Sequence, residues 1–443
     1  MLQPQSFQTH TLSRHPRGGA IGRILAAAIQ AVEPGEAVRR FVHRDGDALI
    51  VDGRVYPLEG IGRIRILGLG KAAQAMSLSL ADLLADHSPR GLLIPKQAPV
   101  HPPGGFDLQP GGHPVPDENS LRAGQKALEL ASGLGADDLL ICLISGGGSA
   151  LMTAPSPGLA LDDLRGLTSA LLACGARIDE INSLRRHLDR LKGGGLAHAA
   201  APARVVSLIL SDVVGNPLEA IASGPTAPDP STRTDALGIL ETYGLAGQVP
   251  AAVLSTLRAA PETPKPGDRL FERVQNVIVG SNALAADAAL RQARREGFEV
   301  LALGDDWQGE AREVGRELAR RLEACPLPRP FCLAAGGETT VTLRGSGQGG
   351  RNQELALAAV RALAGGRESL LITLATDGED GPTDAAGAVV GADSLQRGLA
   401  LGLSPEAFLE DNDAYHYFAA LDDLLRPGPT GTNVNDLAFG FGL

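Results

Sequence analysis

The sequence predicts an α/β protein of two domains whose main sheet is mostly parallel. Apolar segments are repeatedly followed by a glycine-containing turn and then by a helical pattern, which is the order of βαβ units. The chain has 443 residues, more than the roughly 250–300 at which a single hydrophobic core stops growing. Glycine is in excess, at 56 residues, and several glycine tracts directly follow apolar runs. We therefore expect two domains with glycine-rich loops at the ends of strands.

Three buried strands are predicted in the first domain, at 64–69, 139–144 and 205–210, because each is a short apolar run bounded by turn residues. The first of them leads into a helix over about 71–86, where alanine, methionine and leucine recur with the period of 3.6 residues. The residues before Glu33 carry basic but no acidic side chains, and we expect them to form a frayed tail.

The best candidate for a linker is the proline cluster formed by Pro261, Pro264 and Pro266. We place the boundary there, with an N-terminal domain over 1–265 and a C-terminal domain over 266–443, although the βα unit after the prolines is also able to pack on the first domain. The elements expected beyond the cluster are a strand, a helix and a strand between 276 and 303, a hairpin-like stretch over 331–343, a helix over 352–364, a strand over 370–375 and two helices after Ser404 and Asp413.

Composition excludes several classes of protein. The formal net charge of −11 argues against nucleic acid as the main partner, because such binding draws its affinity from neutralised phosphates. No apolar run reaches the length of about 18 residues that a membrane-spanning helix needs. The four cysteines lie far apart without a CxxC pair, which favours reduced thiols and a cytoplasmic location over disulfides or a zinc site.

The first loop that carries chemistry is Gly68–Ala72, between a strand and a helix. The backbone N–H groups after Gly70 and the helix dipole favour an anion, and Lys71 adds a full positive charge. The same spacing satisfies the loose dinucleotide fingerprint, but the second strand leads to Lys96 where an NAD site needs an acidic residue. A tight βα turn that needs small residues is the alternative without a ligand.

A second loop follows the strand at 139–144 and consists of Ser145, Gly146, Gly147, Gly148 and Ser149. Three successive glycines let backbone N–H groups approach a ligand closely, and the two hydroxyls offer further bonds. A flexible linker is the alternative, but linkers do not adjoin buried strands. We therefore predict a binding loop.

A polar stripe is predicted on a helix over 181–195, formed by Asn182, Arg185, Asp189 and Lys192. Such a stripe is commonly a solvated face. Two cations and an asparagine in line on an acidic chain are equally consistent with one wall of an anion site, and the sequence leaves both interpretations open.

Asp212 stands directly after the strand at 205–210, where open α/β sheets place their ligands. Its carboxylate is suited to Mg²⁺ or to accepting a hydroxyl proton, and a turn cap is the alternative. His113 lies between glycine and proline residues, and we expect a structural turn histidine there, with a role in the site as the alternative.

The second half of the chain repeats the use of glycine beside charge. A glycine-rich stretch delivers Arg351 to the start of a helix, where phosphate oxygens meet N–H groups and a bidentate guanidinium. A carboxylate-rich turn at Asp377 suits a hard cation. The remaining candidates in this half are Gly337, Glu338, Gly349, Gly350, Asn352 and, in a polar loop near the C-terminus, Asn433.

Taken together, these strings resemble the glycerate 2-kinase family, whose second domain is called MOFRL and whose members also carry the name hydroxypyruvate reductase in tartrate metabolism. The resemblance extends from about residue 60 to the C-terminus. It rests on the segments 68–72, 113–117, 144–151, 181–197, 208–229, 280–283, 336–354, 376–388 and 428–437, taken in order.

The resemblance implies a Rossmann-like N-terminal domain and a smaller MOFRL-type α/β domain over about 330–443, with the active site in the cleft between them. It implies transfer of the γ-phosphoryl group of ATP to the 2-hydroxyl of D-glycerate, and it places Lys71 and Arg351 at the key catalytic positions. We expect Asp212 or Asp377 to hold Mg²⁺ or to orient the acceptor hydroxyl, and Arg185 or Lys192 to pair with the glycerate carboxylate.

Two alternatives remain at this point. One is an NAD(P)H-dependent hydroxypyruvate reductase, supported by the spacing of Gly68 and Gly70. The other is a non-catalytic protein that binds a nucleotide or a sugar acid. The sequence leaves the oligomeric state open, a homodimer included.

Overall fold

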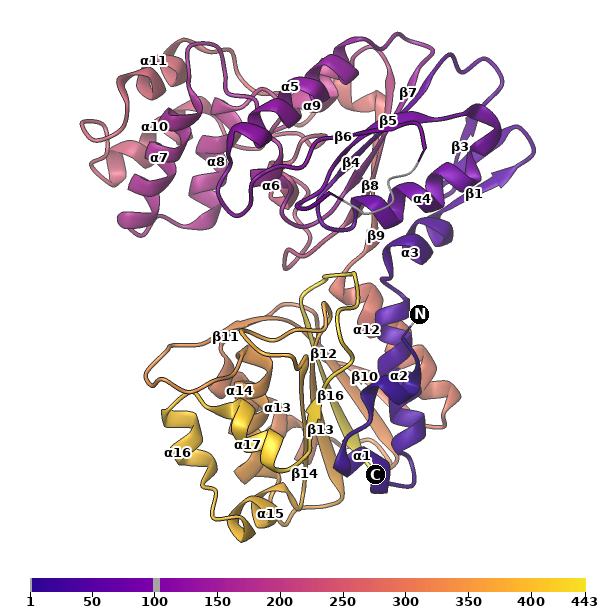
Figure 1. Ribbon diagram of the computed structural model, residues 1–443, viewed down its shortest axis with the longest axis vertical. Helices are drawn as coiled ribbons and strands as arrows, with labels where there is room; N and C mark the ends of the chain where they lie inside the picture. The colour runs from indigo at the N-terminus through magenta and orange to yellow at the C-terminus, as the bar shows by residue number, and fades with distance from the viewer. Residues whose placement is uncertain (1, 99–103) are drawn as a thin grey trace. The chain divides into compact units, whose positions relative to one another are not determined.

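The computed structural model describes residues 2–98 and 104–443, which form two compact units (Figure 1). The central unit is Pro34–Val279. The terminal unit joins the two ends of the chain, since it contains the residues up to Glu33 together with Gly280–Leu443. None of the described helices is long and apolar enough to cross a membrane.

The central unit is built on a six-stranded sheet in the order β6-β5-β4-β7-β8-β9. The strands predicted at 64–69 and 139–144 have those bounds, and the pairings from β6 to β8 are parallel. A separate antiparallel sheet, β1-β2-β3, precedes it. The bounds are β1 Val42–Asp45, β2 Ala48–Val51, β3 Arg54–Pro57, β4 Ile64–Leu69, β5 Arg90–Ile94, β6 Phe106–Leu108, β7 Leu139–Ile144, β8 Arg204–Leu210 and β9 Val274–Gly280.

The helices of the central unit form two hydrophobic clusters. Apolar side chains of α5 and α9 pack on one face of the sheet, among them Ala127 and Leu196. A second cluster, with Leu171 and Leu184 at 0–1% exposure, holds α7, α8, α10 and α11 together beside the sheet. The bounds are α3 Pro34–Phe41, α4 Ala73–Leu83, η2 Ala85–His87, α5 Glu118–Ser132, α6 Gly148–Leu151, α7 Leu161–Ala173, α8 Ile178–Leu188, α9 Gly195–Ala200, η3 Ile221–Ser223, α10 Arg233–Thr242, α11 Ala251–Ala259 and η4 Arg269–Arg273.

The terminal unit has a mixed sheet in the order β10-β12-β16-β13-β14-β15, with β11 paired to β12. Its C-terminal strand β16 lies antiparallel to both β12 and β13. The strand bounds are β10 Glu299–Ala302, β11 Trp307–Glu310, β12 Phe331–Thr340, β13 Ser369–Ala375, β14 Gly387–Gly391, β15 Leu424–Leu425 and β16 Asp436–Gly442. The helix bounds are η1 Pro4–Phe7, α1 His10–Arg14, α2 Gly18–Gln30, α12 Asn282–Arg295, α13 Ala311–Glu323, α14 Arg351–Leu363, α15 Ser394–Ala400, α16 Pro405–Glu410 and α17 Ala414–Ala420.

These sheets confirm the predicted α/β class with a parallel sheet and a second α/β unit. The hairpin expected over 331–343 is instead one continuous strand, β12, in which Gly336 pairs with Leu437 of β16. The glycine is there for packing, because a Cβ on Gly336 would lie 1.5 Å from Asn282 Oδ1. It does not mark a turn.

The compact units differ from the predicted domain boundary in two ways. The residues expected to form a frayed tail are helical, and α2 packs on α12, with Arg23 and Glu296 joined by two hydrogen bonds of 2.7 and 2.8 Å. The proline cluster lies inside the central unit, where Asp229 N donates to Pro264 O, and β9, which follows the cluster, is an edge strand of the central sheet. The division therefore falls after Val279. The proline content of the segment 261–266 suggested a flexible linker. The ends of the two units are instead set by contacts between residues far apart in the sequence.

Candidate active site

Two predicted loops of the central unit meet at the ends of neighbouring strands. β4 has β5 as its neighbour on one side and β7 on the other, so the strand order reverses at β4. Doubly wound sheets bind their ligands at such a reversal. Ala72 N donates to Ser145 Oγ at 3.0 Å, and Lys71 N donates to Gly146 O at 3.3 Å. Gly70 has φ 106°, a conformation that favours glycine. The two loops therefore form one structure.

The glycine tract after β7 brings two further candidates to the same strand ends. A Cβ on Gly146 would lie 2.1 Å from Asp212 Oδ2, so the carboxylate at the end of β8 lies directly against this glycine. A Cβ on Gly147, which has φ 88°, would lie 3.1 Å from the His113 ring. Gly148 begins α6, whose first N–H groups have no partner within the helix. The backbone here is accessible only because side chains are absent.

Positive charge gathers at this edge of the sheet. Partial burial lowers the pKa of His113, and the charges of Lys96 and Lys71 lower it further. Both lysine side chains are exposed. The histidine expected to have a structural role thus stands among the groups of the predicted loops as a neutral ring, and an anion at this edge would be attracted by the two lysines.

The start of the predicted polar stripe is joined to the glycine tract through Ser223. Ser149 and Ser223 form a hydrogen bond between their hydroxyls, and Ser223 Oγ donates to Asn182 Oδ1 at 3.5 Å. Arg185 Nη1 also donates to Asn182 Oδ1, at 3.4 Å. Burial lowers the pKa of the Arg185 guanidinium, and this cation has no ion-pair partner among residues 2–98 and 104–443. It is suited to receive an anionic group.

Lys192 has a different environment. Its ammonium is buried 2.5 Å from Asp189 Oδ2 and donates to Met152 O at 3.3 Å. Asp189 also accepts from Thr153 Oγ1 at 2.6 Å. Because α8 ends at Leu188, the helical spacing predicted over 181–195 does not continue to these two residues. The structure therefore brings Asn182 and Arg185 to the loop, whereas the charge of Lys192 is neutralised internally.

In the terminal unit, two carboxylates hold Arg351 at the first position of α14. Its Nε donates to Asp436 Oδ2 at 2.5 Å, and its Nη1 donates to Glu338 Oε1 at 2.6 Å. Glu338 lies on β12 and Asp436 on β16, beside the paired residue Gly337. The side chain of Arg351 stays 33% exposed. The guanidinium is thus fixed in direction while part of it remains open to solvent.

A buried carboxylate caps the same helix. Asp380 accepts from Asn352 N at 3.1 Å and from Gln353 N at 2.8 Å, and a Cβ on Gly350 would lie 2.3 Å from its Cγ. Burial and the charge of Asp436 raise the pKa of Asp380 to about 7. Burial likewise raises the pKa of Asp436 to about 6, while Arg351 opposes this shift. Two neighbouring carboxyls therefore titrate near neutrality.

Sequence reasoning missed Asp380 and Asp436, although both lie in segments that it singled out. The turn after β13 contains several carboxylates, and nothing in their spacing separates Asp377 from Asp380. In the structure Asp377 is half-buried, and its Oδ1 accepts from Glu379 N at 3.2 Å. The signal that was available is Gly350, whose position before the helix leaves room for a carboxylate.

The polar loop near the C-terminus adjoins this turn. Thr430 Oγ1 donates to Thr376 O at 2.6 Å, and a Cβ on Gly378 would lie 2.1 Å from Gly428 O. Asn433 Oδ1 accepts from Asn435 N at 3.1 Å within the loop. Gly349 packs loosely against Ala414. In the described part of the chain, no group of three or more His, Cys, Asp or Glu side chains is arranged to hold a metal ion by itself.

Two family models match this chain. A family model described as a domain of unknown function, DUF4147, matches residues 20–258. The MOFRL family model matches residues 331–436. The second match includes Glu338, Arg351, Asp380 and Asp436.

Several relatives are similar to this chain over nearly its whole length. A D-glycerate 2-kinase of Thermotoga maritima is 39% identical over 94% of this chain and 96% of the relative. A glycerate kinase of Rattus norvegicus is 40% identical over 94% of this chain and 91% of the relative. A protein of Agrobacterium vitis, provisionally named as a hydroxypyruvate reductase, is 42% identical over 85% and 86% of the two chains.

Solved structures show the same fold. The crystal structure of a glycerate kinase from Thermotoga maritima has a TM-score of 0.86 and 38% identity, with 95% of this chain and 98% of that chain covered. A protein of Pyrococcus horikoshii has a TM-score of 0.87 and 37% identity, with 95% and 97% covered.

Proposed function

This chain belongs to the glycerate kinase family, and we propose that it transfers the γ-phosphoryl group of ATP to the 2-hydroxyl group of D-glycerate, giving 2-phosphoglycerate and ADP. The observation that carries the proposal is the meeting of the Gly70–Lys71 turn with the Ser145–Gly148 loop at the switch point of a parallel sheet. The N–H groups after Gly70 are used between the two loops, so the backbone N–H groups of the glycine tract Gly146–Gly148, together with Lys71, are the groups suited to the phosphates of a nucleotide.

Phosphoryl transfer mainly requires positioning and the neutralisation of charge, because the transition state is loose and its charge is spread over the equatorial oxygens. We assign this neutralisation to Lys71 and Arg351. Lys71 is exposed beside the Ser145–Gly148 loop. Arg351 is fixed by Asp436 and Glu338 with part of its guanidinium open. We expect Gly337, Gly349, Gly350, Asn352 and Asn433 to shape the nucleotide or substrate contacts in the terminal unit.

The acceptor's carboxylate is assigned to Arg185. Its guanidinium is half-buried without a carboxylate partner among the described residues, and Asn182 beside it offers an amide. Lys192 is less suited, since breaking its 2.5 Å pair with Asp189 would leave a buried carboxylate uncompensated. Arg185 and Asn182 therefore hold the carboxylate next to the carbon that carries the reacting 2-hydroxyl group.

Asp212 fits a magnesium ion that accompanies a nucleotide. Its carboxylate lies against Gly146 at the end of β8, and Mg²⁺ in such sites needs only one or two carboxylates in addition to substrate phosphates and water. When bound, the ion would neutralise phosphate charge. The alternative role for Asp212 is to accept the proton of the 2-hydroxyl. Asp377, in the terminal unit, stays a second candidate for a metal ligand.

The reductase alternative has support from the name of the Agrobacterium vitis relative. The structure offers it little, because β5 ends at Ile94 and is followed by Lys96, where a dinucleotide site needs an acidic residue for the ribose. The lysine at that place argues against NADH, whereas a cation there is compatible with the 2′-phosphate of NADPH.

The experiment that decides is a paired assay of the purified chain. One reaction contains D-glycerate, ATP and Mg²⁺, and ADP is followed. The other contains hydroxypyruvate and NADH, and absorbance is followed. ADP formation that depends on D-glycerate supports the proposal, and separation of 2-phosphoglycerate from 3-phosphoglycerate identifies the hydroxyl. Oxidation of NADH without ADP formation overturns it.

A cytoplasmic location is part of the proposal. All four cysteines are free thiols, and burial raises the pKa of Cys142 to about 12, so this thiol is inert to oxidation at neutral pH. The oligomeric state, a homodimer included, stays a prediction.

A further inference from the structure

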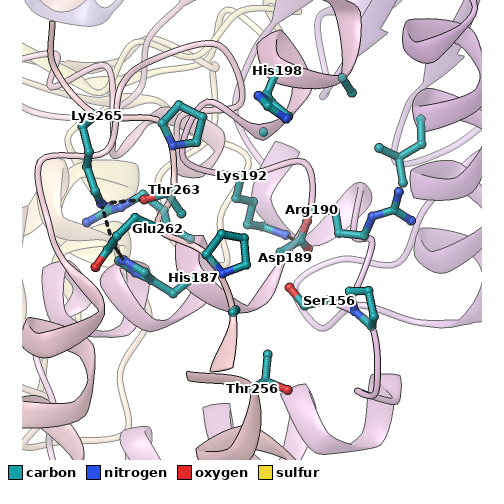
Figure 2. Close-up of a pocket in the computed structure, with 18 of the residues that line it drawn as sticks. Ser156, His187, Asp189, Arg190, Lys192, His198, Thr256, Glu262, Thr263 and Lys265 are labelled. Carbon is teal, nitrogen blue, oxygen red and sulfur yellow. Dashed lines mark hydrogen bonds and ion pairs between the residues drawn. The ribbon is translucent and has the colours of Figure 1, made fainter. Parts of the chain in front are cut away.

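The central unit contains a cavity of about 1340 Å³ that the proposed reaction does not use (Figure 2). Its walls come from α5, α8, α9 and α11 and from the segment 260–270. Gly70, Ser145–Ser149, Asp212 and Arg185 do not line it. The volume exceeds the range of about 300–1000 Å³ that is usual for sites that bind small molecules. The cavity has room for a large organic ligand.

The walls of the cavity are cationic on a chain whose net charge is −11. Its charged residues are Arg186, Arg190, Lys192, Lys265 and Arg269 against Asp189, Glu262 and Asp268, with His187 and His198 in addition. Arg190 and Arg269 are exposed and have no ion-pair partner in the described ranges 2–98 and 104–443. An excess of unpaired positive charge around a cavity favours an anionic ligand.

His187 gives the cavity a second polar feature. Its side chain is 1% exposed, and its Nδ1 lies 2.9 Å from Ser183 O and 3.6 Å from Asp229 Oδ2. Its Nε2 is buried without a hydrogen-bond partner and lies 3.5 Å from Glu262 Oε2. Figure 2 shows His187 beside Glu262 and Lys265, across the cavity from Ser156. A buried ring nitrogen without a hydrogen-bond partner is costly, and a ligand hydroxyl, which both donates and accepts, would satisfy it.

The rest of the lining is largely apolar, with Leu128, Pro157, Ala199, Ala252, Pro261 and Leu270 among its residues. A small inorganic ion would leave this surface wet. We propose that the cavity is a second binding site for an organic anion with an apolar body, whose charge meets Arg190 and Arg269 and whose hydroxyl meets His187.

Residues that line the cavity form hydrogen bonds to the segment that follows the Ser145–Ser149 loop. Lys192 donates to Met152 O, and Asp189 accepts from Thr153 Oγ1 and Ala154 N, in the segment that directly follows α6. A ligand against Asp189 and Lys192 would therefore fix the residues that support the glycine tract. Binding in the cavity changes the rate or the KM of the kinase reaction. This effect rests on the proposed function, whereas binding itself does not.

The test uses the full chain and 8-anilinonaphthalene-1-sulfonate, an aromatic sulfonate, with ADP present at saturation to fill the nucleotide site. Fluorescence titration is expected to show one saturable site. Arg190→Ala weakens it about tenfold, as loss of a charge-assisted contact would. Thr256→Trp fills the cavity and removes binding. Arg122→Ala, on the surface of α5 outside the cavity, leaves binding unchanged.

Each outcome has a meaning. Absence of saturable binding, or equal binding in wild type, Arg190→Ala and Thr256→Trp, overturns the site. Far-ultraviolet circular dichroism shows whether Thr256→Trp is folded, and Arg190→Ala keeps the test valid if it is not. Binding that both variants lose, with kcat and KM for D-glycerate unaffected by the probe in wild type, supports the site and overturns its link to the Ser145–Ser149 loop. Binding without any kinase activity overturns the proposed function alone.

Discussion

Gly70 and Ser145 pack against each other across two adjacent parallel strands, so closely that a Cβ on Gly70 would lie 2.4 Å from the Ser145 hydroxyl. The same hydroxyl accepts the N–H of Ala72 at 3.0 Å. One contact thus joins the turn that carries Lys71 to the loop that carries three glycines. The two loops approach this closely because Gly70 has no side chain.

Gly70→Ala is predicted to lower both activity and stability. The methyl group would overlap Ser145, and φ 106° is strained for any residue with a Cβ. We expect a loss of about 1–3 kcal/mol in the free energy of unfolding, together with a rise in KM for ATP. Urea titration and steady-state kinetics measure these. Gly238→Ala, in α10 with open space around it, is the control and should be neutral or slightly stabilising.

We predict that Asp436→Asn lowers kcat, because the guanidinium of Arg351 is then no longer held in its orientation. The charged oxygen that receives Nε at 2.5 Å is lost, while Glu338 still holds Nη1. We expect kcat to fall about tenfold or more with a smaller change in KM, as for loss of an interaction made in the transition state. Comparison with Glu338→Gln, at the other end of the guanidinium, shows which carboxylate orients it. A change in KM alone for Asp436→Asn would argue against a positioning role.

Because of Asp380 and Asp436, we predict that the free energy of unfolding falls as pH rises from acid to neutral. Their pKa values of about 7 and about 6 lie above the ordinary value for aspartate, so the folded chain binds more protons than the unfolded chain in this range. Their contribution is complete below pH about 4, the unfolded value, and is lost as pH passes through 6 and 7.

The measurement is the free energy of unfolding at several pH values between about 5 and 8, by chemical denaturation. Asp380→Asn should make the slope flatter, because it removes one of the two raised groups. Asp377→Asn, in the same turn but half-buried, should leave the slope as in wild type. An unchanged slope in Asp380→Asn would show that this carboxyl is ionised throughout.

Substitutions of Arg185 and Lys192 are predicted to affect different quantities, KM for D-glycerate in the first case and the stability of the fold in the second. Arg185→Gln should raise KM for D-glycerate at least tenfold with little loss of stability, since an ion pair to the substrate carboxylate disappears. Lys192→Met should destabilise the fold by about 3–5 kcal/mol, because Asp189 would remain buried without its partner. Kinetics and urea titration of both variants separate the roles, and a stable Lys192→Met with a raised KM would reverse the assignment.

Much of the fold was predictable because its signals are local. The strands at 64–69 and 139–144 are apolar runs between turn residues, and Ser404 and Asp413 precede helices as expected. The association of α2 with α12 was not predictable, because a helical pattern shows which face is buried but not against which partner.

The residues of the candidate site also fall into those that local sequence signals predicted and those that they did not. The sequence predicted that Gly70, the Ser145–Ser149 loop and Asp212 lie close together, because each follows a buried strand and parallel strands end at one edge. Asp380 was missed because its burial depends on Gly350. Lys192 was placed in a helical stripe although α8 ends before it, and helix ends are set by local capping more than by period.

Lys71, held beside the glycine loops, is assigned to neutralise charge on the transferring phosphoryl group. The direct measurement is kcat for ADP formation by Lys71→Ala with D-glycerate, ATP and Mg²⁺, with circular dichroism to verify folding. The side chain is exposed, so the fold should persist. We expect kcat to fall about 100-fold or more, as for loss of a preorganised electrostatic group. A kcat within a few-fold of wild type would contradict it.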